Sequence, residues 1–176
     1  MIKKIGIAII TICVMGFCLD FAHASYLGNT QISFERAIEI AFGRAGGNGT
    51  VKEVEWNLKY GQPIYEVEIY RNGQKYEIKI NGVTGEVFRL KSKQTYKIPA
   101  GLTVSQITSA RSNEFAKIAV DMLGGGTVVN IEWEQKTFGT IVDVKIINNG
   151  VKHEVKINPV TSEIVQHKQK SKAKYY

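Results

Sequence analysis

The chain has 176 residues, a formal net charge of +7 at neutral pH and a hydrophobic content of 44%. This length and composition suffice for one ordinary domain or two small ones with a hydrophobic core. Four lysines in the last nine residues supply much of the charge. Without them and the N-terminal segment, the chain holds 17 basic and 15 acidic residues. This near balance argues against a nucleic-acid-binding fold.

The first residues have the features of a secretion signal. Lys3 and Lys4 give a positive start, residues 5–19 form a mostly apolar run, and Ala22-His23-Ala24 fits the small-x-small pattern of a cleavage site. We therefore predict a signal peptide over residues 1–24 and a secreted, periplasmic or cell-envelope location. The alternative is a retained membrane anchor, for which the run is short, since a span needs about 20 apolar residues.

Cleavage near Ala24-Ser25 would remove both cysteines of the chain, Cys13 and Cys18. The mature protein would then have no disulfide, no thiol nucleophile and no cysteine metal site. Its stability would depend on its hydrophobic core.

An amphipathic helix is predicted to begin at Ser33, a residue type that caps helix N-termini. The apolar residues that follow have the spacing of one buried stripe: Phe34, Ala37, Ile38, Ala41 and Phe42. Gly46, Gly47 and Gly49 end the helix. The next strand alternates apolar residues (Val54, Trp56, Leu58) with polar ones (Glu53, Glu55, Asn57).

Residues 63–87 contain a predicted β-hairpin. Asn72-Gly73 between alternating apolar runs is typical of a two-residue hairpin loop, because both turn residues need positive φ. Counting outward from this loop pairs Ile69 with Tyr76 on the inward face and Tyr70 with Lys75 on the outward face. A second turn at Thr84-Gly85 leads to a short last strand, residues 86–90.

The same unit recurs 77 positions later. Trp56 corresponds to Trp133, and Asn72-Gly73 corresponds to Asn149-Gly150. The second helix carries an apolar stripe from Phe115 to Leu123, with a start as early as Ser105. In the second hairpin, Val144 is expected to face Val155, and His153 is expected to face inward opposite Ile146.

These elements predict an α+β fold of two tandem repeats, each with one helix packed on an antiparallel sheet of about three to four strands. The repeats span residues 32–91 and 104–167, with a linker over residues 92–103, and Trp56 and Trp133 are expected to anchor two cores. Residues 168–176 are predicted to form a basic, disordered tail. The alternative for this tail is weak contact with an anionic lipid or wall surface.

Residues 32–90 resemble the PepSY domain pattern, in which a helix precedes a Tyr-x-Val strand, a dipeptide turn, a second strand and a closing Thr-Gly-Glu-Val. The stretches that carry the resemblance are YEVEI, NGQKYEIKI and NGVTGEV. Residues 112–166 resemble the pattern more weakly. Val142, His153 and Ser162 stand there in place of Tyr65, Tyr76 and Gly85.

The resemblance implies a helix packed on an antiparallel sheet. PepSY domains resemble part of the propeptides of thermolysin-like metallopeptidases, so the resemblance also implies a role in inhibiting or regulating a peptidase. It implies no catalytic residue.

The sequence shows no catalytic constellation. His153-Glu154 lacks the second histidine of an HExxH motif. His153 and His167 alone are too few for a histidine metal cluster or a robust triad. The glycines after each helix precede strands, which indicates helix stops and not phosphate loops. We therefore predict no enzyme, no cofactor and no metal site.

The predicted function is exported, non-enzymatic protein binding, with a secreted or envelope peptidase as the partner class. The contact surface is expected at a sheet edge or on the outward polar face, where Tyr70 is the candidate partner-binding residue because aromatic residues are enriched at interfaces. Two alternatives stay open: a small-ligand or signal-sensing envelope domain that uses the groove between the copies, and a structural wall-associated protein. No nucleic-acid partner is expected, and the oligomeric state is left open.

Overall fold

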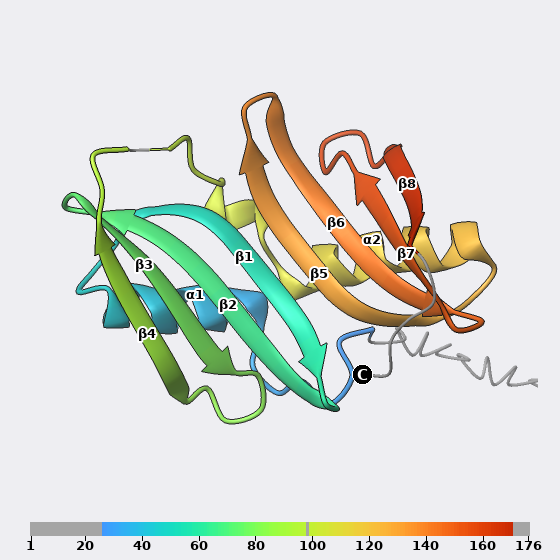
Figure 1. The fold of residues 1–176 in the computed structure, drawn as a ribbon, viewed down its shortest axis with the longest axis horizontal. Coiled ribbons are helices and arrows are strands. Elements are labelled where there is room, and N and C mark those ends of the chain that lie inside the picture. Colours follow the sequence, from blue (N-terminus) through green and yellow to red (C-terminus); the bar gives the residue numbers. More distant parts are fainter. Residues whose placement is uncertain (1–25, 98, 171–176) are drawn as a thin grey trace, which may run out of the picture.

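The computed structural model describes residues 26–97 and 99–170, so the predicted signal peptide lies outside the described residues. It contains helices α1 (Phe34–Arg44) and α2 (Ser109–Leu123), a short 3-10 helix at Val104–Gln106, and eight strands (Figure 1). The strands are β1 (Thr50–Lys59), β2 (Gln62–Arg71), β3 (Gln74–Asn81), β4 (Val87–Gln94), β5 (Thr127–Lys136), β6 (Gly139–Asn148), β7 (Val151–Ile157) and β8 (Ile164–Lys170).

All eight strands form one antiparallel sheet in the order β4-β3-β2-β1-β5-β6-β7-β8. The expectation of two separate sheets, each of about three to four strands under its own helix, is therefore wrong. The two halves join through β1 and β5, where Glu53 pairs with Glu134 and Asn57 with Asn130. In one repeat alone, β1 would be a long unpaired edge strand. Pairing with β5 satisfies its backbone groups.

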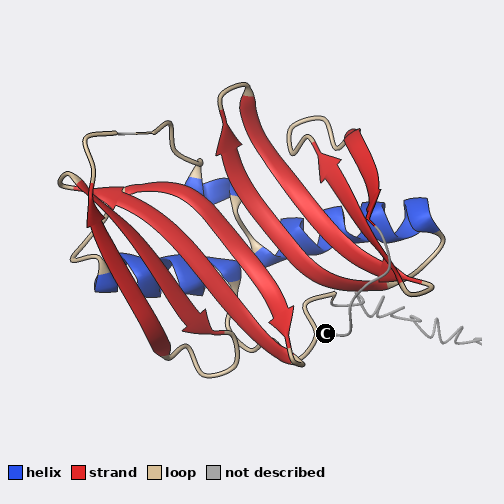
Figure 2. Cartoon of the chain, viewed as in Figure 1, coloured by secondary structure: helices blue, strands red, loops and turns tan. Residues whose placement is uncertain are grey.

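Both helices pack on the same face of this sheet (Figure 2). Helix α1 contacts β1, β2 and β3, whereas α2 contacts β5 and β6. The core is continuous across the junction, because Trp56 stands opposite Ile131 and Trp133 stands opposite Val54 on the helix-bearing face. The two tryptophans thus belong to one core and do not anchor two separate ones.

Local sequence accounts for the ends of the helices. Ser33 caps α1 by accepting a hydrogen bond from the backbone N–H of Arg36 (3.1 Å). Thr108 caps α2 by accepting from the N–H of Arg111 (3.2 Å), so this helix begins at Ser109 and not at the earlier limit of Ser105. Gly124 ends α2 in the left-handed conformation, with φ of 68°.

The predicted hairpin registers are confirmed in both halves. Ile69 pairs with Tyr76 across the first hairpin, and Val144 pairs with Val155 across the second. Asn72 adopts φ of 50° and Gly73 adopts φ of 71°, the left-handed values that a two-residue loop requires. The inward and outward faces are therefore those read from the sequence.

The two outermost strands extend beyond the predicted unit boundaries. Strand β4 continues to Gln94, so its last residues are those that the sequence assigned to the linker. Strand β8 continues to Lys170, so it includes three residues that the sequence assigned to the tail. Lysines along both edge strands hinder pairing with a further strand, because a cation would have to be desolvated.

Candidate protein-binding face

Seven carboxylates line the centre of the sheet face that carries no helix. Glu68, Glu53 and Glu134 stand opposite one another on β2, β1 and β5 and form one row. The second row runs across β2, β1, β5 and β6 and consists of Glu66, Glu55, Glu132 and Asp143. We call these seven residues the acidic face. They come from both repeats, and the β1–β5 pairing brings them together.

Strand alternation and two bulges aim these side chains outward. Val54 and Trp56 point into the core. Glu55, between them, and Glu53, before them, therefore point to the opposite face of the sheet. The register shifts at Lys52, between Val51 and Glu53, which keeps Val51 buried although it lies two residues from Glu53. A matching shift between Val128 and Asn130 of β5 has the same effect in the second repeat.

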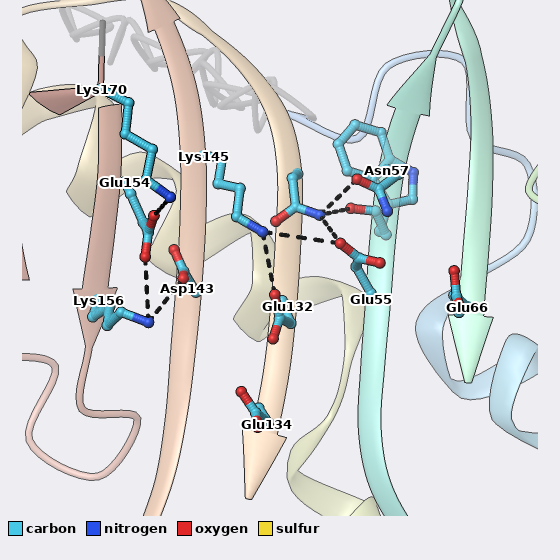
Figure 3. Close-up of polar contacts among 12 residues, drawn as sticks. Glu55, Asn57, Glu66, Glu132, Glu134, Asp143, Lys145, Glu154, Lys156 and Lys170 are labelled. Carbon is cyan, nitrogen blue, oxygen red and sulfur yellow. Dashed lines mark hydrogen bonds and ion pairs between the residues drawn. The ribbon is translucent and has the colours of Figure 1, made fainter. Parts of the chain in front are cut away.

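Lysines from neighbouring positions neutralise much of the acidic face. Lys145 reaches Glu132 at 3.2 Å and Glu55 at 4.0 Å, so it ties the two repeats together across the junction (Figure 3). Further ion pairs join Lys79 to Glu66, Lys75 to Glu68, Lys52 to Glu134, and Lys156 to Asp143. Pairs on a solvent-facing surface each contribute at most about 1 kcal/mol to stability.

Glu53 is the exception, because it forms no ion pair within the described part of the chain. Burial, and to a smaller extent the charges of Glu132, Glu55, Glu68 and Glu134, raises the pKa of this carboxyl from 4.5 to about 8. Glu53 therefore holds a proton at neutral pH. The neutral carboxyl relieves repulsion at the centre of the acidic face.

The pKa values of the other carboxyls depend on their cations. Burial raises the pKa values of Glu132 and Asp143 despite their lysine partners. For Glu134, burial acts in the same direction, but Lys136 and Lys52 together bring the pKa below its usual range. On β7, Glu154 is buried, yet hydrogen bonds, first among them that from Lys170, lower its pKa to about 2.

Glu53, Glu132 and Glu134 could offer three oxygen ligands to a hard cation, since their carboxylate oxygens lie within 4.8 Å of one another. Lys52, which pairs with Glu134 at 3.4 Å, and the proton on Glu53 already lower the negative charge there. The arrangement is better described as a partly neutralised surface than as an ion cage.

Asn130 links the two repeats beside the acidic face. This side chain is only 2% exposed, and its amide donates to Glu55 (2.6 Å), to Asn57 (2.7 Å) and to the backbone carbonyl of Trp56 (3.2 Å). Its Oδ1 accepts no hydrogen bond in the described structure.

A shallow hollow of about 250 Å³ lies beside Asn130, lined by Glu55, Asn57, Leu58, Lys59, Val129, Asn130, Lys145 and Lys152. The boundary that was expected to be a groove is thus hydrogen-bonded sheet with this hollow on its surface.

Tyr70, the candidate from the sequence, lies on β2 opposite Lys75 and on the same sheet face as Glu68. Burial raises the pKa of its hydroxyl, and the neighbouring Glu68 raises it further through a hydrogen bond and its charge. Tyr70 is therefore at the margin of the acidic face and not at its centre. The sequence did not single out Glu53, Glu55, Glu132 and Glu134, although their alternation with Trp56 and Trp133 was a visible signal.

His153 lies on the inward face as predicted, opposite Ile146. The structure also brings it to His167 of β8, with His153 Nδ1 and His167 Nε2 3.1 Å apart. Neither position is near the acidic face. As for the membrane, neither described helix has the length and apolarity that a transmembrane span requires.

Comparison with known proteins identifies part of the chain. Residues 31–90 match the family described as the peptidase propeptide and YPEB domain, PepSY. The fold is similar to the crystal structure of a "putative lipoprotein" from Clostridium difficile 630, with a TM-score of 0.66 and 14% identity, covering 80% of this chain and 95% of that one. At this identity the similarity concerns the fold alone. Comparison with curated proteins gave no match.

The family match covers α1 and strands β1 to β4, the part of the chain whose residues resemble the PepSY pattern in sequence. The description of this family names peptidase propeptides. Residues 31–90 of this chain are a PepSY domain.

Proposed function

We propose that this chain is an exported, non-catalytic binding module, and that its acidic face contacts a basic surface of a partner protein. The class of partner that we propose is a secreted or cell-envelope peptidase. Support for this class comes from the PepSY domain at residues 31–90, a family described by its occurrence in peptidase propeptides. Support for export comes from the features of residues 1–24.

The acidic face carries the proposal. No element of the described chain covers it, since α1 and α2 both pack on the opposite face. Its carboxylates are partly withdrawn from water, since Glu53 and Glu132 are half-buried and Asp143 is buried. A basic partner would supply cations to groups that now repel one another. Such complementarity accelerates association and favours partners of the right charge.

Inhibition of a secreted metallopeptidase tests the proposal. We expect micromolar chain to slow peptide hydrolysis and the effect to weaken as salt is added. The double variant E66Q/E68Q removes two charges of the acidic face, and we expect it to weaken inhibition by about tenfold or more. The matched control, E39Q/E114Q, removes two charges from exposed positions on α1 and α2.

The two parts of the proposal fail separately. An unchanged rate of hydrolysis at micromolar excess, across several secreted metallopeptidases, would exclude a peptidase inhibitor. Equal inhibition by E66Q/E68Q and by the control E39Q/E114Q would exclude the acidic face as the contact surface.

A further inference from the structure

A pair of histidines stands on the helix-bearing side of the sheet, at the edge formed by β7 and β8. Nδ1 of His153 and Nε2 of His167 are 3.1 Å apart, and the two rings are nearly parallel, with an interplanar angle of 20° and centroids 5.3 Å apart. His153 is half-buried and His167 is exposed. In the register of this edge His153 faces Gln169 and His167 faces Val155, so the two histidines are diagonal neighbours on one face.

The lysines of β8 lie on the other face of the sheet from the two histidines. Along β8, Lys168 and Lys170 alternate with His167, and Lys168 stands opposite Glu154. Lys170 pairs with Glu154 on the other face of the sheet. The register partners on the histidine face are Val155, Gln169 and Ile146, which carry no charge. The imidazole nitrogens are therefore directed to a region without a neighbouring strand cation.

The distance between the nitrogens suits a shared metal ion. Imidazole binds Zn²⁺ at about 2.0–2.1 Å, so two such ligands lie roughly 2.9 Å apart at a right angle and roughly 3.4 Å apart at the tetrahedral angle. The observed 3.1 Å falls between these values. We propose that His153 and His167 bind a divalent transition metal ion, such as Zn²⁺, Ni²⁺ or Cu²⁺, with water completing the coordination. In the described structure the two nitrogens share a hydrogen bond, so an ion would replace this bond and both rings would rotate until their lone pairs converge on the metal.

The first repeat has no counterpart of this site. Shifted by 77 positions, His153 corresponds to Tyr76 and His167 to Leu90, and both of these are unable to bind such an ion through nitrogen. The strand pairs are equivalent, since Tyr76 faces Ser92 and Ile78 faces Leu90. The metal would thus act on one edge of the sheet alone. By joining β7 to β8, it would hold the edge strand against fraying.

Titration of the mature chain, residues 25–176 produced without a histidine tag, with Ni²⁺ and Zn²⁺ tests the proposal. We expect one equivalent to bind, the melting temperature to rise by a few degrees at saturating metal, and amide exchange in residues 164–170 to slow. H167Q, which changes an exposed side chain and keeps it polar, is expected to abolish all three effects, and H153Q is expected to do the same. Q166A, which changes an exposed side chain on the other face of β8, is the matched control and is expected to keep them.

Two results would overturn the proposal. One is the absence of binding at millimolar metal in the unmodified chain. The other is one bound equivalent that persists in H167Q or H153Q, or that disappears in Q166A, because the ion would then be held elsewhere. Circular dichroism of each variant shows that the fold is retained.

Discussion

Replacing Glu53 with glutamine should make the protein more stable at neutral and alkaline pH. The carboxyl of Glu53 lies among four other glutamates and has no lysine partner in the described chain. Burial, with the charges of these glutamates, raises its pKa from 4.5 to about 8. Glutamine has nearly the same shape and stays neutral. E53Q therefore removes a charge that the folded state disfavours and leaves the packing of β1 intact.

The raised pKa of Glu53 determines in which direction, and over which pH range, the stability of the protein changes. Between pH 4.5 and about 8 the folded state binds a proton at Glu53 that the unfolded chain has released, so the free energy of unfolding falls as the pH rises. The full shift corresponds to roughly 5 kcal/mol as an upper bound. Solvent screening on an open sheet face reduces this, and we expect about 1–2 kcal/mol.

Urea unfolding of both proteins across this pH range measures the effect. The unmodified chain and E53Q should be similar near pH 4.5, and E53Q should be more stable by about 1–2 kcal/mol above pH 8. The control E39Q, on the exposed face of α1, should follow the unmodified chain at every pH. If the difference between E53Q and the unmodified chain stays constant from acid to alkaline pH, Glu53 does not carry the raised pKa and the reasoning is refuted.

Three further predictions concern the fold. Ser162 has φ of 61°, and the equivalent residue of the first repeat, Gly85, has φ of 76°. Glycine adopts these left-handed values without the steric cost that other residues have. In urea titrations S162G should therefore raise the free energy of unfolding by about 1 kcal/mol, and G85S should lower it by about the same amount. The buried hydroxyl of Ser112 accepts from the indole N–H of Trp133 at 3.0 Å, so S112A should cost about 1–3 kcal/mol by the same assay, and no loss would contradict the bond. The core is continuous, so the whole domain should unfold in one step. In the single-tryptophan variants W56F and W133F, the fluorescence transition should therefore coincide with the circular dichroism transition of the same variant. Two separated transitions would indicate two cores.

The sequence predicted the features that depend on neighbouring residues. The Asn72-Gly73 loop sets the hairpin register through its own backbone preference, and apolar alternation sets which side of each strand is buried. The pairing of β1 with β5 joins residues 73 to 81 positions apart, and no turn specifies it. The exposed edge of β1 could be covered by a strand, a helix or a loop, and the sequence does not show which. The single eight-stranded sheet was therefore not predicted.

The same limit applied to the two functional candidates. Glu53 and Glu134 become neighbours only through the β1–β5 junction. His153 and His167 become neighbours only through the pairing of β7 with β8, whose register places them diagonally on one face. In both cases the residue types were visible, but the contact that gives them a chemical role was a tertiary one.

The acidic face is a consequence of how the repeats meet. Glu55 and Glu132 are equivalent residues of the two copies, 77 positions apart, and they face each other across the junction. The pairing therefore has a local pseudo-two-fold axis at this pair, like the self-complementary contact of a symmetric dimer. A residue on such an axis faces its own equivalent, so a carboxylate in both copies necessarily faces a carboxylate.

Stability alone would favour an uncharged or opposite pair at this position, as with Asp143 and Lys156 one strand further on. The chain instead has two glutamates on the axis and places Glu53 opposite Glu134 beside them, and the proton on Glu53 and the lysine bridge from Lys145 only partly offset the repulsion. A locally unfavourable arrangement at the centre of an uncovered face is typical of functional surfaces and agrees with the proposed binding role. A cationic partner would stabilise the complex by completing the neutralisation that the chain leaves unfinished.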